Sequence, residues 1–501
     1  MNPSLVHLPW LAANLPGYFR FREALGSPER AQRSLLEDYL KTNADTAFGR
    51  AHGFASIRSA EEYRERVPLT KGEELAPWVD RIAAGEARVL TRSPVRALEP
   101  TSGSSSSPKL IPYTSTFQRE IRRAVAPWIF DLYSHRPRLA FGSAYWSITP
   151  LAMEEERAGP VRVGFEEDSQ YLGGLWGRLV DATLAVPGEV RHLRDPDAFR
   201  YATLKYLLMR RDLTLISVWH PSFLLLLLEA LPRFWDDLVR EVGRPDLKTF
   251  SPAHVWPRLG LISCWGDAHA ALSLSELARA FPGVEIQPKG LIATEGFVTI
   301  PFRGAWPLAV RSHFFEFLLE DGGSPRFAWE LEEGRVYSVV LTTGGGLYRY
   351  RLQDRVRVEG FLEKTPSLRF LGKEGHVSDL RGEKLHESFV AGALARVSGG
   401  LAARFAMLVP DGESGYVLLL ETDSPVPADL AARLDAELSS NPHYRLCRSL
   451  GQLAAVRVRS LQPGAYARYL DRCRQLGQRW GDVKPLALSP LSGWEEALGV
   501  E

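Results

Sequence analysis

The stretch TSGSSSSPKLIPYT, residues 101–114, places a turn of small hydroxyl residues directly before a short apolar strand. A serine-rich tract is compatible with a flexible spacer. It is also compatible with a phosphate-binding turn, in which backbone N–H groups and hydroxyls approach an anion and Lys109 supplies positive charge. Short strands are predicted over 87–100 and in LIPYT, and a helix over 117–133, so the turn lies inside a folded unit and the second interpretation is favoured.

The composition is that of an ordinary globular protein, with 45% apolar and 24% charged residues. At 501 residues the chain exceeds the size of a single core, so two or more domains are expected. The net charge of +1 argues against a nucleic acid or an anionic membrane as the main partner. No apolar run approaches the roughly 20 residues that span a bilayer. Three scattered cysteines favour neither disulfides nor zinc, and we expect a cytoplasmic protein whose oligomeric state is left open.

The chain begins with a helical segment that is followed by α/β units. Residues 1–85 are predicted to be mostly helical, and over 212–296 apolar strands alternate with helices. Such sheets bind ligands where loops leave the carboxyl ends of their strands. Two longer strands, in RVYSVVLTT (335–343) and LYRYRLQDRVRVEGF (347–361), are joined by three glycines. The fold class expected from this order is α/β.

A second domain is expected after residue 375. KEGHVSDLRGEK (373–384) is polar and contains glycines, as a hinge would, and a compact α+β pattern follows it. FAMLVPDGESGYVLLLET (405–422) is predicted to form a hairpin with its turn at 411–415. A helix is predicted to open at Pro427, with Leu430, Leu434 and Leu438 on one face. We therefore divide the chain into residues 1–375 and a lid-sized C-terminal domain, 376–501.

The segment from Gly103 to Lys109 has the spacing of a Walker A loop, whose form is GxxxxGK followed by Ser or Thr. Pro108, however, stands where glycine is required, and Leu110 stands where the hydroxyl that binds magnesium is required. The P-loop interpretation therefore fails on chemistry.

Further motifs follow the serine-rich turn in order along the chain. They are GLIATEGFVTIP (290–301), AVRSHFFEFL (309–318), LTTGGGLYRYRLQDRVRVEGF (341–361), NPHYRLCRSLGQLAAVRVRSLQPGAYARYL (441–470) and GDVKP (481–485). Together with TSGSSSSPKLIPYT they closely resemble the acyl-acid amido synthetases of the Gretchen Hagen family, the auxin-responsive plant enzymes and their bacterial relatives, within the adenylate-forming superfamily. The resemblance implies a large N-terminal adenylation domain, with sheets flanked by helices and a β-barrel-like part, and a small α+β lid domain.

The resemblance also implies an activity. It is that of an ATP-dependent ligase that activates a carboxylic acid as an acyl-adenylate and transfers the acyl group to the amine of an amino acid or a similar acceptor. This chemistry needs a held triphosphate whose charge is neutralised as pyrophosphate departs. Glu295, beside Thr294 in the second motif, is expected to hold Mg²⁺, a hard cation that prefers oxygen ligands. The residues expected to bind the phosphates are Ser102, Gly103, Ser104, Ser105 and Lys109.

Asp354 lies on an unexpected face of its strand. From Tyr348 to Val358 the even positions are apolar or aromatic apart from Asp354, while Arg and Gln residues occupy the odd positions. A buried carboxylate must be paired or hydrogen-bonded. A structural ion pair with an arginine is one alternative. The family resemblance implies the other, in which Asp354 accepts hydrogen bonds from the ribose hydroxyls of ATP.

Two lysines compete for the role of neutralising charge in the transition state. Lys384, just after the proposed hinge, matches the position of the hinge-region lysine of the family. Lys484, in GDVKP, resembles the late lysine of the superfamily's mobile lid. We place Lys384 first and Lys484 second, against the alternative that either is a solvated surface lysine.

The acyl-acid pocket is expected near two helices. SVWHPSFLLLLLEAL (217–231) and REIRRAVAPWIFDLY (119–133) resemble acid-binding elements of the family, although leucine-rich helices more often belong to a core. The candidate residues are Arg122, Val218, Trp219 and Phe223.

The chain departs from the family pattern at three positions. Ser106 and Ser107 replace glycines in the turn, and Gln353 stands where the family usually has glycine before the aspartate. A non-glycine residue is strained where φ is positive. Two alternatives stay open beside the amido synthetase. One is an acyl-CoA ligase, which has the same adenylation step, and the other, suggested by the serine replacements, is a nucleotide-binding pseudoenzyme with a regulatory or binding role.

Overall fold

The computed structural model describes residues 4–101, 109–146, 157–164, 184–193, 195–268, 270–320, 322–374, 377–398, 401, 403–412, 415–476, 483 and 485–500. The N-terminal segment is helical, as predicted. Helix α2 buries Leu35, Leu36, Tyr39 and Leu40, whose spacing places them on one face. The helices of this segment are α1 (Ser4–Leu25), α2 (Pro28–Asn43), α3 (Ala47–Ala51), α4 (Ala60–Arg66) and α5 (Gly72–Ala83).

An antiparallel strand pair surrounds the serine-rich turn. Strands β1 (Val95–Pro100) and β2 (Leu110–Thr114) pair along their length, and the Thr101 N–H donates to the Lys109 carbonyl oxygen at 2.8 Å. Helix α6 (Ser115–His135) starts directly after β2, where the Thr114 hydroxyl accepts the Phe117 N–H at 3.1 Å. The strands on either side of residues 102–108 in the chain are therefore paired with each other, which argues against a spacer between domains.

The strand predicted over 87–94 does not form. Arg88 has a φ of 56°, and the carbonyl oxygens of Arg88 and Val89 accept the N–H groups of Ala47 and Phe48 at the start of α3. These two carbonyl oxygens accept hydrogen bonds from free N–H groups at the start of a helix, and not from a neighbouring strand. The apolar Val89 and Leu90 are nevertheless buried.

A parallel sheet forms the middle of the molecule, as the alternation of strands and helices predicted. Its order is β3-β6-β7-β8, and all its pairs are parallel. Every residue of β6 is buried, which suits a strand covered on both faces. The elements are β3 (Ser143–Trp146), α8 (Pro196–Met209), β6 (Leu213–Ser217), α9 (Pro221–Glu241), α10 (Pro252–Val255), β7 (Leu261–Trp265), α11 (Ala270–Ala280) and β8 (Glu285–Lys289), with a small pair β4 (Arg157–Ala158) and β5 (Val161–Arg162).

A five-stranded antiparallel sheet follows, with the order β12-β11-β13-β14-β15. In β14 buried positions alternate with half-buried ones from Tyr350 to Val358, which confirms the predicted pattern and the burial of Asp354. The strands are β11 (Phe314–Leu319), β12 (Arg326–Phe327), β13 (Val336–Thr342), β14 (Tyr350–Leu362) and β15 (Thr365–Lys373).

Arg349 departs from the predicted face of that strand. It is buried with a φ of 49°, and its guanidinium forms two hydrogen bonds to the Glu316 carboxylate, at 2.9 and 3.0 Å. The left-handed backbone turns the side chain inward, and the carboxylate on β11 compensates its charge. The prediction that Arg349 lies on the odd, exposed face is therefore wrong.

The C-terminal residues form a smaller α+β unit around the sheet β18-β19-β20. The predicted hairpin is confirmed, and the Asp411 N–H donates to the Gly415 carbonyl oxygen at 2.9 Å. The helix predicted to open at Pro427 starts three residues later, at Leu430, with its three leucines buried. The elements are β16 (Val377–Ser378), β17 (Leu385–His386), α12 (Glu387–Val397), β18 (Ala403–Pro410), β19 (Tyr416–Thr422), α13 (Leu430–Leu438), α14 (Pro442–Ser449), β20 (Arg457–Ser460), α15 (Ala465–Gln475) and α16 (Trp494–Leu498).

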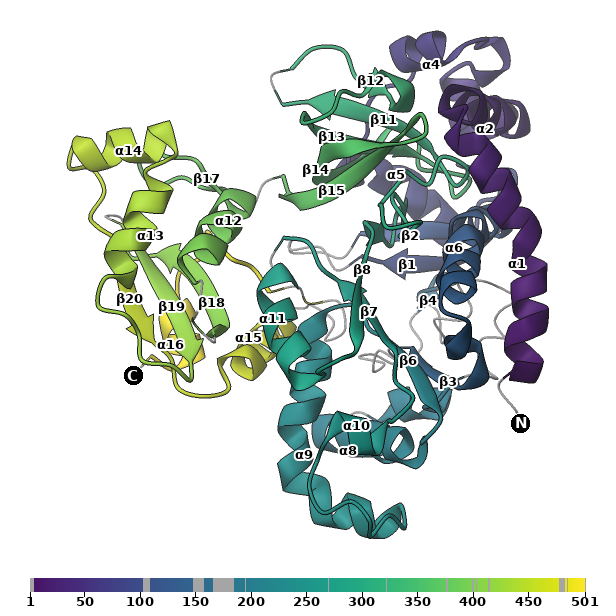
Figure 1. The fold of residues 1–501 in the computed structure, drawn as a ribbon. Helices are drawn as coiled ribbons and strands as arrows, with labels where there is room; N and C mark the ends of the chain where they lie inside the picture. The colour runs from purple at the N-terminus through teal and green to yellow at the C-terminus, as the bar shows by residue number, and fades with distance from the viewer. Residues whose placement is uncertain are drawn as a thin grey trace.

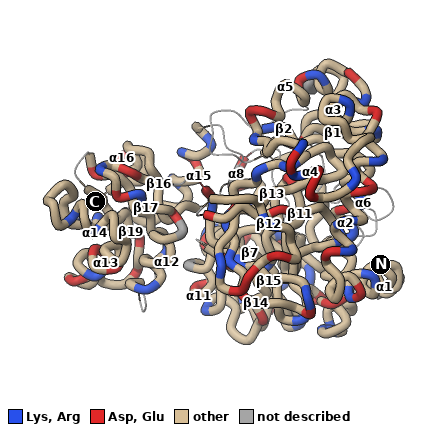
Figure 2. Tube along the Cα trace, turned by 90° about the horizontal axis from the view of Figure 1, so that it is seen from above, with Lys and Arg blue, Asp and Glu red and all other residues tan. Residues whose placement is uncertain are grey.

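The smaller unit lies beside the larger one, with α11 and α15 at the junction (Figure 1). Leu226 of α9 packs against the core of the smaller unit, and Arg404 lies 3.9 Å from the Glu229 carboxylate. Basic and acidic residues are interspersed on both units (Figure 2). Among the described residues, no helix is both long and apolar enough to cross a membrane.

Candidate functional site

The three sequence motifs meet in space. Tyr113, at the end of the serine-rich hairpin, donates its hydroxyl hydrogen to the Thr294 carbonyl oxygen at 2.7 Å. Thr294 and Glu295 form the two-residue turn between β9 (Ile292–Ala293) and β10 (Gly296–Phe297). Glu295 is 8% exposed and also contributes to the raised pKa of Tyr113, after burial and Glu99. The second motif therefore lies directly against β2, the strand that follows the serine-rich turn in the chain.

Glu295 and Asp354 belong to one electrostatic cluster. Burial raises the pKa of Tyr350 first, and the charges of Glu295 and Asp354 raise it further. The same two carboxylates raise the pKa of Lys373 on β15, with Asp354 the largest cause and burial opposing it. Two distant acidic residues, a tyrosine and a lysine thus lie within electrostatic range of one another. The cluster is built from β14, β15 and the β9–β10 turn.

Asp354 is 3% exposed, and the ammonium of Lys373 lies 3.9 Å from its Oδ1 atom. A lysine of the neighbouring strand is thus a cation beside this carboxylate. Gln353 has a φ of 64°, which is the conformation that glycine adopts without strain. The departure noted at this position therefore falls where the backbone favours glycine.

Lys109 lies at the exit of the phosphate turn, and its aliphatic stem packs against Gly72 at the start of α5. The neighbouring Thr70 bonds to the third motif: its N–H donates to the Arg349 carbonyl oxygen at 2.9 Å and its carbonyl oxygen accepts the Arg351 N–H at 2.8 Å. The segment 70–72 therefore joins the phosphate turn to the strand of Asp354. Ser102, Gly103, Ser104, Ser105, Ser106, Ser107 and Pro108 lie outside the described residues.

Lys384 lies in the smaller unit, between β16 and β17. It is exposed with a φ of 45°. The preceding Glu383 is fully buried and accepts the N–H groups of Leu380 and Arg381, both at 2.7 Å, so the turn before Lys384 is held rigidly. The pKa of His386 is lowered by burial first and then by Arg355, with a smaller contribution from Lys384.

Arg355 follows Asp354 on β14, and His386 lies two residues after Lys384 in the chain, so the influence of Arg355 on the His386 pKa indicates that the segment of Lys384 lies within electrostatic range of β14. The second lysine candidate, Lys484, lies outside the described residues.

The acid-pocket candidates are distributed over two regions. Val218 is fully buried in the core below α9, and Phe223 is half-buried against Phe199. Trp219 follows the carboxyl end of β6, with its ring centroid 5.5 Å from that of Trp265 at the end of β7. Arg122 lies on α6, where burial and then Arg119 and Arg96 lower its pKa.

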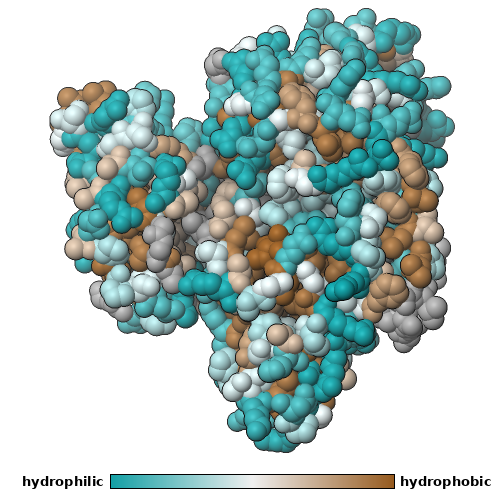
Figure 3. All heavy atoms as spheres, in the orientation of Figure 1, coloured by the Kyte–Doolittle hydropathy of each residue, from teal (hydrophilic) through white to brown (hydrophobic). Residues whose placement is uncertain are grey.

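Lys289 is a residue that the sequence analysis missed. It ends β8, is 4% exposed, donates to the Ser217 hydroxyl at 2.9 Å and lies 4.7 Å from the Trp219 ring centroid. It therefore lies at the carboxyl ends of the parallel strands, where ligands of such sheets bind. The available signal was its place six residues before Glu295, at the end of a predicted strand. Apolar side chains gather on the surface near α11 and the β7–β8 side of this sheet (Figure 3).

The site suits magnesium brought by a nucleotide. No group of three or more potential ligand residues capable of holding a metal occurs among the described residues. Mg²⁺ is commonly held by one or two carboxylates together with substrate phosphates. Glu295, buried beside the hairpin of the phosphate turn, fits the role of such a carboxylate.

A parallel sheet, an antiparallel sheet and a small C-terminal α+β unit define an adenylate-forming fold. The chain belongs to the GH3 family: the family's N-terminal domain matches residues 18–250, its central domain 306–373 and its C-terminal domain 390–490. This confirms the resemblance drawn from the ordered motifs.

Relatives and solved structures agree with this assignment. The chain is 22% identical to a probable indole-3-acetic acid-amido synthetase of Oryza sativa subsp. japonica, over 92% of this chain and 91% of the relative. It is 22% identical to an indole-3-acetic acid-amido synthetase of Arabidopsis thaliana, over 90% and 87%. The fold matches the GH3.15 acyl acid amido synthetase in complex with 2,4-DB with a TM-score of 0.85, at 18% identity over 98% and 96% of the two chains. It matches 2-hydroxyisobutyryl-CoA ligase with a TM-score of 0.55, at 15% identity over 86% and 85%.

Proposed function

We propose that this protein is an ATP-dependent acyl-acid amido synthetase, which forms an amide between a carboxylic acid and the amine of an amino acid or a similar acceptor. The observation that carries the proposal is the gathering of Glu295, Asp354 and Lys373 beside the hairpin of the serine-rich turn. These residues come from distant parts of the chain, and their gathering supports a site for ATP at this place. The curated relatives act as amido synthetases, which supports the same chemistry here.

In the first half-reaction, a carboxylate oxygen of the acid attacks the α-phosphorus of ATP. The bond between the α-phosphorus and the bridging oxygen breaks, and pyrophosphate leaves with that electron pair. The serine-rich turn and Lys109 hold the phosphates, Asp354 accepts hydrogen bonds from the ribose hydroxyls, and Thr294 and Glu295 line the site. Bound Mg²⁺ supplies charge neutralisation on the phosphates.

Lys384 adds positive charge as pyrophosphate departs, because an ammonium aimed at a developing charge lowers the barrier. It is well suited to this role, since the turn before it is fixed by Glu383 while its own side chain is exposed. Lys484 is the second candidate.

In the second half-reaction, the neutral amine attacks the acyl carbon, the bond to the AMP oxygen breaks, and the amine proton is lost to solvent or to a base. We place the boundary between residues 375 and 376, so that residues 1–375 form the adenylation domain and residues 376–501 the lid. Closure of a lid excludes water, which would otherwise hydrolyse the adenylate.

The acid is proposed to lie at the carboxyl ends of the parallel strands, near Trp219 and Lys289, with Val218 and Phe223 supporting that wall and Arg122 approaching from α6. The three cysteines, Cys264, Cys447 and Cys473, are free and buried, which agrees with a reducing compartment such as the cytoplasm.

An acyl-CoA ligase is the second candidate, because the fold also matches 2-hydroxyisobutyryl-CoA ligase. The test is a panel of carboxylic acids screened by acid-dependent exchange of labelled pyrophosphate into ATP, followed by mass spectrometry of the product formed with amino acids or with CoA. An amide product supports the amido synthetase, and a thioester supports the CoA ligase. A folded protein that binds ATP but shows no exchange with any acid is the pseudoenzyme.

A further inference from the structure

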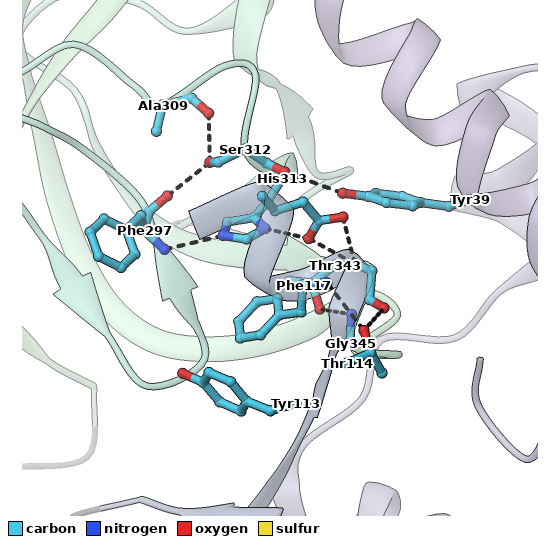
Figure 4. Close-up of polar contacts among 12 residues, drawn as sticks. Tyr39, Tyr113, Thr114, Phe117, Phe297, Ala309, Ser312, His313, Thr343 and Gly345 are labelled. Carbon is cyan, nitrogen blue, oxygen red and sulfur yellow. Dashed lines mark hydrogen bonds and ion pairs between the residues drawn. The ribbon is translucent and has the colours of Figure 1, made fainter. Parts of the chain in front are cut away.

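Glu120 and His313 form a buried pair next to the nucleotide site. Glu120 is 1% exposed on α6, and His313, just before β11, is fully buried. His313 Nδ1 lies 3.1 Å from Glu120 Oε2. Figure 4 shows the imidazole of His313 among polar contacts that reach Phe297 on one side and the loop of Thr343 and Gly345 on the other. The two residues are 193 positions apart in the chain, and neither has a role in the proposed half-reactions.

The hydrogen bonds indicate which nitrogen of the His313 ring donates and which accepts. The Phe297 backbone N–H donates to His313 Nε2 at 3.2 Å, so that nitrogen presents a lone pair and carries no proton. The ring proton is therefore on Nδ1, where it is donated to Glu120. Glu120 acts as an acceptor for this ring and for the Gly344 N–H. Two hydrogen bonds therefore run in series: Phe297 donates to His313, and His313 donates to Glu120.

The same carboxylate holds the glycine loop of the third motif. The Gly344 N–H donates to both oxygens of Glu120, at 3.1 and 2.9 Å. The approach is so close that a Cβ atom at Gly344 would collide with the Glu120 carboxylate. On the other side of the loop, the Thr114 hydroxyl donates to the Gly344 carbonyl oxygen at 2.8 Å, and that hydroxyl also caps α6. The glycine loop is thus bound at its N–H and at its C=O to the first turns of α6.

The imidazole holds the loop of the second motif in the same way. Phe297 is the residue after Gly296 and the second after Glu295. A Cβ atom at Gly296 would lie 2.8 Å from His313 Nε2, so the ring packs directly against this turn. Glu120 and His313 therefore connect α6, which follows the phosphate turn, with the turn of Glu295 and with the loop that leads into the strand of Asp354.

We propose that Glu120 and His313 are positioning residues of the nucleotide site, which fix the Glu295 turn and the loop 343–346 relative to the phosphate turn. The inference rests on the proposed ATP site. Neither residue touches the nucleotide. Both act through the two loops, and the loops set the positions of Glu295 and of the strand of Asp354 relative to β2 and the start of α6.

Two substitutions at His313 each remove a different one of these two hydrogen bonds. His313→Asn keeps an amide N–H near the position of Nδ1 and retains the bond to Glu120, but it loses the acceptor for Phe297. His313→Gln places its carbonyl oxygen near the position of Nε2 and retains the Phe297 bond, but it loses the donor to Glu120. Each substitution breaks the hydrogen-bonded connection between the Glu295 turn and Glu120. Both are therefore expected to weaken Mg·ATP binding by about 10-fold to 100-fold, the size of the loss when residues that hold metal ligands in place are mutated. The affinity for AMP, which lacks the β- and γ-phosphates, is expected to fall much less.

The measurement is calorimetric titration of the folded full chain with Mg·ATP and with AMP, at a temperature where circular dichroism shows each variant native. Ile129→Ala is the control for stability, because Ile129 is fully buried in the same helix and takes no part in these hydrogen bonds. It should lower the melting temperature without changing the ratio of the two affinities. Glu120→Gln replaces the histidine variants should either fail to fold, and it is expected to alter the ratio in the same direction.

An unchanged ratio of Mg·ATP to AMP affinity in the variants, with wild-type affinity intact, overturns the positioning role. A wild-type chain that binds neither nucleotide overturns the proposed function itself, so the two failures are distinguishable. Equal losses of both affinities, matched by Ile129→Ala, show a purely structural pair and also overturn the proposal.

Discussion

The Tyr113 hydroxyl donates to the Thr294 carbonyl oxygen at 2.7 Å, and this bond joins the strand that leaves the serine-rich turn to the turn that carries Glu295. The two residues are 181 positions apart, so their contact is a property of the fold. If both turns hold one triphosphate, their relative position determines how tightly Mg·ATP binds.

Tyr113→Phe removes this bond and leaves the ring in place. We expect a loss of about 1 kcal/mol, or roughly fivefold weaker Mg·ATP binding, as for a single neutral hydrogen bond. Tyr133→Phe is the matched control, because the Tyr133 hydroxyl is buried on α6 without a hydrogen-bond partner among the described residues. Equilibrium titration with Mg·ATP checks both variants. Equal affinities for Mg·ATP in the two variants would show that the Tyr113 hydroxyl does not contribute to the site.

Asp354→Ala tests the contact with the ribose. The substitution is expected to weaken ATP binding by about tenfold or more, as when one partner of a charge-assisted hydrogen bond is lost. The sharper readout uses 2′,3′-dideoxy-ATP, which lacks both hydroxyls. Wild type should discriminate against this analogue, and the variant should not, because the two changes remove the same interaction. Discrimination that survives in Asp354→Ala would place the ribose elsewhere.

Lys384→Met is expected to slow acyl-adenylate formation by about 100-fold, the scale of a lost electrostatic contact in a transition state. Lys484→Met should have the smaller effect on this step if Lys384 is the adenylation lysine. Lys364→Met, which changes an exposed lysine in the turn between β14 and β15, is the control. Single-turnover measurement of pyrophosphate release separates them, and a reversed order of the two effects would transfer the role to Lys484.

Glu387 predicts a pH dependence of stability in the C-terminal unit. Burial raises the pKa of this carboxyl from 4.5 to about 7, against the opposing hydrogen bond from the Ala487 N–H. The folded state keeps the proton after the unfolded chain has lost it. The stabilising contribution is therefore complete below pH 4.5 and is lost as pH rises through about 7, by at most about 3 kcal/mol.

Glu387→Gln carries a neutral group at every pH, so its unfolding free energy relative to wild type should rise between pH 5 and pH 8. Denaturant unfolding at both pH values checks this. Glu496→Gln, at an exposed position of α16, serves as the control and should show no such trend. A wild-type stability that does not fall over this range would contradict the assignment.

Local patterns predicted much of the fold, because they depend on near neighbours in the chain. The alternation along β14 placed Asp354 on the buried face, and the strands that flank the serine-rich stretch pair with each other. Family motifs, given in order, identified Glu295. The structure brings Glu295 and Asp354 into one cluster, which no local pattern could show.

Features that depend on distant contacts were missed. Arg349 is buried because a positive φ turns it toward Glu316, 33 residues earlier. Glu120 lies among charged residues of a helix, where an acidic side chain usually marks a solvated face, and only the fold reveals His313 beside it. Lys289 similarly ends a strand, and only the fold places its ammonium over the Trp219 ring.

The central claim is that the acid is activated by transfer to AMP. The most direct measurement follows a heavy-oxygen label placed in the carboxylate of an acid that supports turnover. Attack of the carboxylate on the α-phosphorus predicts that one labelled oxygen appears in AMP when the amide is released, with unlabelled pyrophosphate as the other product. Label in orthophosphate accompanied by ADP would contradict the account, because it would show activation through an acyl phosphate.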